Sequence, residues 1–401
     1  MSRYRWVILG AGTFAQTSFA ALVVGLAAIA PLLRSEYGLS LGQTGVVLAA
    51  VSIGILPTVL LWGVLADRFG ERLVMAVGLS GAGVTFLLIP ATHGFASLVG
   101  LLVLAGALGS SINAASGRAV MGWFGAEQRG LALGIRQTAV PIGGAVSAAV
   151  LPWIASTGGT RDAFFTLGAF CIAAAVVAVV LVREAPGGGR SPLGDVARTF
   201  RSLHNWVLAG GSGLFVVAQI ALTNYPVLFL HQHRGLSTHS AALVLATMNV
   251  FGIGARIGSG RWSDGVQSRV GPLRKLGSLI TVGTALVAVL ADAPLEALVP
   301  VLVVAGVLSL SWNGLAFTAA AETAGLAQSG AALGFQQTVL GIIVAVATPA
   351  FGALVAATSW RVAFVAAACC PVLGVLALRR LPSSIAGGRS RETSVIPPAI
   401  P

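Results

Sequence analysis

Residues 63–75 read GVLADRFGERLVM and form a short charged connection between two long apolar segments, residues 42–65 and 73–91. A helix needs about 20 apolar residues to cross a hydrocarbon core of roughly 30 Å, and both segments are about that long. Gly63 and Gly70 flank the first charges, where glycine permits close approach and tight turns. We therefore interpret this stretch as a loop between two membrane-spanning helices.

Apolar segments of spanning length recur along the whole chain. Of its 401 residues, 56% are hydrophobic and 9% are charged, whereas a soluble domain has about 25% charged residues. Strict alternation of polar and apolar residues, typical of a membrane β-barrel, is absent. The sequence therefore predicts an all-α membrane protein with twelve transmembrane helices. The predicted helices are residues 6–30, 42–65, 73–91, 96–121, 130–154, 163–183, 206–230, 240–262, 275–291, 297–320, 331–356 and 361–379.

The positive charge of the chain is unevenly placed. The net charge is +12, and of the 24 lysines and arginines seventeen fall on one side of the predicted membrane and four on the other. Because loops rich in bases stay in the cytoplasm, we expect both termini to be cytoplasmic. The charge thus encodes orientation in a lipid bilayer, and we expect no nucleic-acid partner. The seventeen are Arg3, Arg5, Arg68, Arg72, Arg129, Arg183, Arg190, Arg198, Arg201, Arg261, Arg269, Arg274, Lys275, Arg379, Arg380, Arg389 and Arg391, and the four are Arg34, Arg161, Arg234 and Arg361.

The two halves of the chain are related in sequence. Residues 130–138, GLALGIRQT, match residues 330–338, GAALGFQQT, at an offset of 200. The spacing from Gly63 to Asp67 recurs from Gly260 to Asp264. We therefore predict two bundles of six helices that can move as separate bodies. Their bounds are residues 1–183 and 203–380, with a cytoplasmic linker over 184–202 and a disordered cytoplasmic tail over 381–401.

The loop over residues 63–75 resembles the signature G-x-L-A-D-R-x-G-R-R, which lies between helices 2 and 3 in the major facilitator superfamily. It departs from that signature at Glu71, where the family usually has a base. The resemblance implies two six-helix pseudo-repeats that carry a small solute by alternating access, as a secondary transporter rather than an enzyme. It also implies that the loop holds one conformation closed, and we expect Glu127 to pair with Arg72. The residues assigned to gating are Gly63, Asp67, Arg68, Gly70, Arg72 and, by the repeat, Asp264.

Three arginines fall inside predicted helices, whereas no acidic residue falls near the middle of one. Arg136 and Arg256 reach similar depths, one from each half. A charged side chain at the centre of a membrane helix is costly and therefore indicates function. Such a pair favours a small organic anion as the solute. The third, Arg118, lies near the end of a helix, and we expect it to brace a loop.

The sequence around Arg256 resembles helix 8 of the oxalate/formate and monocarboxylate branches of the superfamily. In those branches that arginine is implicated in binding a carboxylate. Gly252 stands where a proton-coupled monocarboxylate carrier has an aspartate, which argues against proton symport by that route. Amide side chains accompany the arginines and are candidates for orienting the ligand. They are Gln16, Gln137, Gln219, Asn224, Gln336 and Gln337.

Other interpretations of the sequence stay open. Arg136 and Arg256 could instead be satisfied by backbone carbonyls and amides in a structural role. Residues 134–144 are similar to the helix 5 motif of drug antiporters, with the spacing one residue short, so a drug or metabolite efflux antiporter is the second candidate. A membrane sensor with a transporter fold is the third. We expect a monomer in a bacterial cytoplasmic membrane, with no cofactor and no metal.

Overall fold

The computed structural model describes residues 3–92, 94–185 and 196–382, and every regular element within those ranges is helical. Eleven helical stretches are long and apolar enough to cross a membrane. The elements of the first half are α1 Tyr4–Ala28, α2 Ala30–Glu36, α3 Leu41–Phe69, α4 Glu71–Leu88, η1 Ile89–Ala91, α5 Phe95–Gly109, α6 Ser111–Trp123, α7 Arg129–Gln137 and α8 Ala139–Leu181. The rest are α9 Val196–Arg201, α10 Leu203–Thr223, α11 Pro226–Leu228, η3 Phe229–His233, α12 Thr238–Gly265, α13 Val270–Val289, α14 Leu295–Leu310, α15 Asn313–Ala324, η4 Leu326–Gln328, α16 Ser329–Ala357 and α17 Trp360–Leu378.

One of the eleven stretches, Arg129–Leu181, crosses the bundle twice. It has 53 residues, and Gly159 interrupts α8 with φ +69°, a conformation that favours glycine. On either side of this break, Ser147 donates a hydrogen bond to the carbonyl of Ala21 and Cys171 lies against the carbonyl of Ser18. Since both partners belong to one stretch of α1, α8 folds back on itself. The prediction of twelve transmembrane helices is confirmed.

The connection between the second and third predicted helices is tighter than a loop. The side chain of Ser40 and that of Gln43 form a capping box at the start of α3. Helix α3 continues to Phe69, and α4 begins at Glu71. Gly70, with φ +89°, is the only residue between them. The charged residues therefore lie on helix ends and not in a loop.

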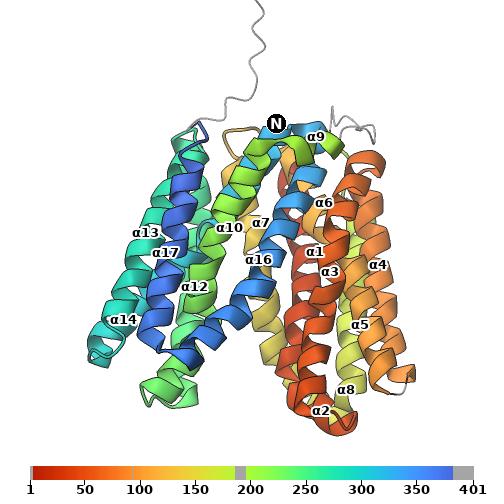
Figure 1. Ribbon diagram of the computed structural model, residues 1–401. Coiled ribbons are helices and arrows are strands. Elements are labelled where there is room, and N and C mark those ends of the chain that lie inside the picture. The colour runs from red at the N-terminus through yellow and green to blue at the C-terminus, as the bar shows by residue number, and fades with distance from the viewer. Residues whose placement is uncertain (1–2, 93, 186–195, 383–401) are drawn as a thin grey trace, which may run out of the picture.

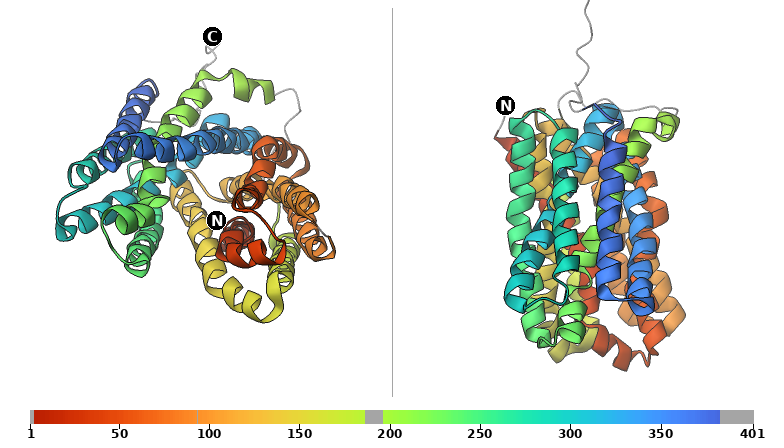
Figure 2. Two further views of the ribbon diagram at one scale, coloured as in Figure 1. Left: turned by 60° about the horizontal axis from the view of Figure 1, so that its bottom comes forward. Right: turned by 60° about the vertical axis from the view of Figure 1, so that its left-hand side comes forward.

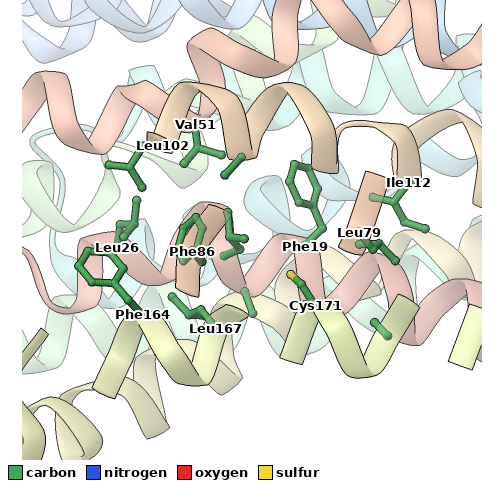
Figure 3. Close-up of a cluster of buried hydrophobic side chains, with 14 of the residues drawn as sticks. Phe19, Leu26, Val51, Leu79, Phe86, Leu102, Ile112, Phe164, Leu167 and Cys171 are labelled. Carbon is green, nitrogen blue, oxygen red and sulfur yellow. The ribbon is translucent and has the colours of Figure 1, made fainter. Parts of the chain in front are cut away.

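The helices form two bundles, α1 to α8 and α10 to α17, with α9 between them in sequence (Figures 1 and 2). Each bundle has a core of its own. The first is built from residues such as Phe19, Phe86 and Phe164 (Figure 3), and the second from Phe229 and Phe364 among others. Residues 186–195 of the expected linker and residues 383–401 of the expected tail lie outside the described residues.

A third cluster of buried side chains joins the two bundles at one end. It includes Leu9, Phe124 and Leu133 from the first bundle and Phe215 and Leu378 from the second. We call this end, where α3 and α12 finish, the aspartate end. The ribbons of the bundles draw apart toward the opposite end (Figure 1). The halves are thus packed together at the aspartate end.

Candidate functional site

Asp67 joins the two halves at the aspartate end. It lies in the last turn of α3 and is 3% exposed. Its carboxylate accepts hydrogen bonds from the backbone N–H groups of Gly330, at 2.9 Å, and Ala331, at 2.7 Å. These groups belong to the first turn of α16, where N–H groups have no partner within the helix and the helix dipole favours an anion. Asp67 therefore caps a helix of the other half.

Asp264 makes the same contact in the opposite direction. It lies near the end of α12 and accepts hydrogen bonds from the N–H groups of Gly130, at 2.9 Å, and Leu131, at 2.7 Å. Both donors are in the first turn of α7, in the first half. The internal repeat is therefore expressed as two equivalent helix caps across one interface.

Glycines bring the backbones into contact beside both caps. A Cβ atom on Gly63 would lie 2.3 Å from the carbonyl oxygen of Gly330, and one on Gly260 would lie 2.2 Å from that of Gly130. These distances are far below van der Waals contact, and the atoms concerned are backbone. Helices α3 and α16, like α12 and α7, can approach this closely only because no side chain stands between them.

Arg118 pairs with both acidic side chains around the first cap. It is 4% exposed, and its Nε lies 2.8 Å from Asp67 while its Nη1 pairs with Glu71. This pair accounts for the departure from the signature at Glu71, because a base there would face Arg118. The expected partnership of Arg72 with Glu127 is absent from the described residues. Both of those side chains are exposed.

Arg269 plays the corresponding part at the second cap. Its Nη1 lies 2.5 Å from Asp264, and its Nε lies 3.0 Å from Glu322 on α15. Its Nη2 also donates to the carbonyl of Ala126, in the other half. Burial lowers the pKa of Arg269, but the two carboxylates more than offset this and leave it raised. Arg269 was not among the residues assigned to gating from the sequence, although it lies 197 residues after Arg72 and so close to the offset of the repeat.

The remaining residues assigned to gating lie around the first cap without charged partners among the described residues. Arg68 is exposed, and its guanidinium lies 5.3 Å from the centre of the Phe69 ring. Gly70 forms the turn to α4. The charged contacts of the first cap therefore rest on Asp67 and Glu71, with Arg118 between them.

Arg136 is held entirely by the first half. It lies on α7 and is 2% exposed. Its Nε donates to the hydroxyl of Ser116 at 2.7 Å, and its Nη1 donates to the side chain of Gln137 at 3.3 Å. Its Nη2 donates to the carbonyl of Asn113 at 2.6 Å and to the side chain of Gln16 at 3.1 Å. All three nitrogens thus have neutral acceptors.

Arg256 is buried with far fewer partners. It lies on α12 and is 5% exposed. Its Nη1 donates to the backbone carbonyl of Gln137 at 2.5 Å, across the interface between the halves. Its Nε is buried and has no acceptor among the described residues. No carboxylate of the described residues pairs with it, so its positive charge is not neutralised.

The other candidate amides are dispersed. Gln219 accepts a hydrogen bond from the indole of Trp312 at 3.1 Å. Gln336 is buried and donates to Ser212 at 2.8 Å. Asn224 is exposed at the end of α10 away from the aspartate end, and Gln337 is half-buried without a hydrogen bond to the described residues. Of the six, Gln16 and Gln137 are therefore the two that form hydrogen bonds with Arg136 or Arg256 among the described residues.

These contacts define a candidate site around Arg256, at the level where α12 meets the end of α7. A buried guanidinium without a carboxylate can bind an anion through charge-assisted hydrogen bonds. Among the described residues, no group of three or more histidine, cysteine or acidic side chains is placed to hold a metal ion.

Comparison with known proteins agrees with this architecture. A family model described as "Major Facilitator Superfamily" matches residues 9–348. An uncharacterized MFS-type transporter of Mycobacterium tuberculosis strain H37Rv is 31% identical over 396 residues, which cover 98% of this chain and 88% of that protein. The hexuronate transporter of Bacillus subtilis strain 168 is 26% identical over 257 residues, 61% of each chain. The structure of a proton:xylose symporter superposes with a TM-score of 0.74 at 18% identity and covers 94% of this chain and 96% of that one.

Proposed function

The chain belongs to the major facilitator superfamily, and from this premise we propose that it carries a small organic anion across a bacterial cytoplasmic membrane by alternating access. The chain is a multi-pass membrane transporter, not an enzyme. The anion and the mechanism are the proposal. One observation carries it: Arg256 is buried between the halves, and among the described residues it has no carboxylate partner and its Nε has no acceptor.

The energetics of Arg256 support an anionic ligand. An ionised group that is buried without a partner loses its hydration, and leaving one of its donors unsatisfied costs about 1–3 kcal/mol or more. Folded proteins retain such groups chiefly at functional sites. An anion that accepts from Nε would remove this cost. Hexuronate, the solute named for the Bacillus subtilis relative, is an anion of this kind.

The gating assignment follows from the two caps. Since the placement of bases predicts cytoplasmic termini, we assign the aspartate end to the cytoplasmic side. The conformation seen here is then closed toward the cytoplasm. Release of the solute to that side requires Asp67 and Asp264 to leave the N-termini of α16 and α7. Gly63 permits the close contact that the first cap needs.

The test is a ligand screen on the purified protein and on two matched variants. Small carboxylates, glucuronate, inorganic anions, neutral sugars and cationic drugs are compared by thermal shift, then by uptake into proteoliposomes. A ligand present at a hundred times its dissociation constant stabilises by about 2.7 kcal/mol if it binds only the folded state. We expect organic anions to stabilise the protein and Arg256→Gln to abolish that shift.

Arg261→Gln is the control, because Arg261 is exposed on the same helix and its loss changes the net charge equally. We expect this variant to bind anions as the unmodified protein does. Stabilisation by cationic or apolar compounds that Arg256→Gln leaves unchanged would overturn the proposal. It would favour an efflux antiporter and give Arg256 a structural role.

A further inference from the structure

Resting on the proposed function, we infer that the solute is a hydroxylated monoanion: one carboxylate held by Arg256 and hydroxyl groups held by the second half. Anions of the same skeleton with two charges are excluded. The basis is that equivalent polar residues of the two halves differ in the hydrogen bonds that they form.

In the described part of the chain, one buried arginine has a nitrogen that a ligand could use. The described residues hold four buried arginines. Arg118 pairs with Asp67 and Glu71, and Arg269 pairs with Asp264 and Glu322. Neither can bind a second anion without breaking its own ion pairs. The four are Arg118, Arg136, Arg256 and Arg269.

Arg136 adds positive potential without offering a nitrogen that lacks an acceptor. Each of its three nitrogens already donates to the first half, and the geometry is fixed by four residues on three helices. A carboxylate that approached it would have to displace acceptors such as Ser116 and Asn113. Of the four buried arginines in the described residues, Arg256 is therefore the one whose Nε is left to donate to a carboxylate.

Comparison of the two repeats shows which polar side chains have no hydrogen bond to the described residues. In the first half, Asn113 accepts a hydrogen bond from Gln16, and Gln137 accepts one from Arg136. At an offset of 200, the second half has Asn313, Gln336 and Gln337 in place of Asn113, Arg136 and Gln137. Gln336 turns instead to Ser212. The side chains of Asn313 and Gln337 then make no hydrogen bond to the described residues, and both are half-buried.

The helix that carries Asn313 approaches the same part of α7 as the backbone of Arg256 does. A Cβ atom on Gly134 would lie 2.5 Å from the carbonyl oxygen of Arg256, and one on Gly314 would lie 3.1 Å from the Cα of Gly134. The residue next to Asn313 and the backbone of Arg256 therefore meet at one glycine of α7. An amide both donates and accepts, which suits hydroxyl groups. Arg256 and the amides of Asn313 and Gln337 therefore complement a ligand with one negative charge and several hydroxyl groups.

The test compares gluconate with glucarate, which share a six-carbon hydroxylated skeleton and differ by a second carboxylate. Lactate and acetate are added as monoanions with one hydroxyl or none. Dissociation constants are measured on the full-length protein in detergent. Because a second buried carboxylate would be unpaired, we expect glucarate to bind at least about tenfold more weakly than gluconate.

Two variants test the hydroxyl contacts. We expect Asn313→Leu and Gln337→Leu each to weaken gluconate binding by about tenfold, the effect of losing a typical hydrogen bond to a buried polar group, and to leave acetate unchanged. Gln232→Leu, at an exposed amide on η3 away from the aspartate end, is the control and should leave both unchanged.

The outcomes separate this inference from the proposed function. If glucarate binds as tightly as gluconate or more tightly, and Arg256→Gln abolishes this binding, the inference that the solute has a single charge is wrong. The proposal of anion transport would still stand. Binding of acetate or lactate but not gluconate would overturn the hydroxylated skeleton alone. If no anion binds and Arg256→Gln changes nothing, the proposed function fails and this inference fails with it.

Discussion

Glu71 shows how one substitution in a signature is explained by a partner elsewhere in the chain. It is 2% exposed, and the base that compensates it, Arg118, lies 47 residues away on α6. Asp67 shares the same guanidinium. Three charges are therefore buried together in one half, and the group is stable only while the arginine is present.

We expect Arg118→Gln to be strongly destabilising. Removing one partner of a buried ion pair costs about 3–5 kcal/mol, because the remaining charges are left buried and uncompensated. The measurement is the denaturant or thermal unfolding midpoint of the purified protein.

Arg72→Gln is the matched control, since Arg72 is exposed beside the same signature. Substitutions at exposed positions usually change the free energy of unfolding by less than about 0.5 kcal/mol. Equal effects of the two substitutions would contradict the assignment of Arg118 as the central charge.

Arg136 and Arg256 illustrate a second point at the scale of the residue. Both are arginines at similar depth in the predicted helices, yet one is saturated by neutral acceptors of its own half and the other is not. The difference arises from neighbours that are distant in sequence. This difference in hydrogen-bond partners distinguishes a structural arginine, Arg136, from a candidate ligand-binding arginine, Arg256.

At the scale of the element, two helix pairs carry the contact between the halves: α3 with α16, and α12 with α7. In each pair a glycine of one helix touches the backbone of the other, and an aspartate one turn away caps the facing helix. The cap and the close approach depend on each other, because the carboxylate reaches the N–H groups only at this separation.

We expect Gly260→Ala to disfavour the packed conformation. The added Cβ would lie 2.2 Å from the Gly130 carbonyl oxygen, which is backbone and cannot rotate away. Spin labels at the exposed residues Phe69 and Val266, one in each half at the aspartate end, should report a larger separation between the halves.

Gly254→Ala on the same helix is the control, since its Cβ would meet nothing within 4 Å. It should leave the distance distribution unchanged. If Gly260→Ala also leaves the distance distribution between the spin labels unchanged, the contact between α12 and α7 does not determine how closely the halves pack.

At the scale of the whole molecule, two bundles with separate cores share one further cluster at the aspartate end. This division suits motion of the halves as bodies (Figures 1 and 2). Separation at the aspartate end parts the shared cluster, the two caps and the hydrogen bonds that Arg256 and Arg269 make to the first half. Both caps must then break in the same transition.

We therefore expect the effects of Asp67→Asn and Asp264→Asn on the closed state to add as free energies. If each cap contributes about 1 kcal/mol, each substitution should change the ratio of closed to open molecules about fivefold, and the double variant about 25-fold. The ratio is read from the same spin-label pair. We also expect Asp67→Asn to slow transport while leaving expression and ligand affinity nearly unchanged.

A double variant no more shifted than the stronger single variant would contradict a concerted opening. Unchanged transport in Asp67→Asn would contradict the gating role.

The amino-acid sequence by itself determined the class and topology of the protein. Span length, the repeat at an offset of 200 and the signature over residues 63–75 predicted twelve helices in two halves, because hydrocarbon thickness and backbone hydrogen bonding leave a membrane chain few alternatives. Asp67 and Asp264 could also be identified from the sequence, because each follows a glycine at the same spacing in its half. Arg269 could have been found by extending that comparison a few residues.

Only the tertiary structure decided which side chains are partners. The association of Glu71 with Arg118 and that of Arg269 with Glu322 join residues 47 and 53 positions apart, and the caps join residues more than 130 apart. Periodicity carries no information on such contacts. Saturation of Arg136 and the unpartnered Nε of Arg256 follow from the packing of four helices, α1, α6, α7 and α12. Hydrogen bonds depend on distances of a few tenths of an ångström that no local sequence pattern specifies.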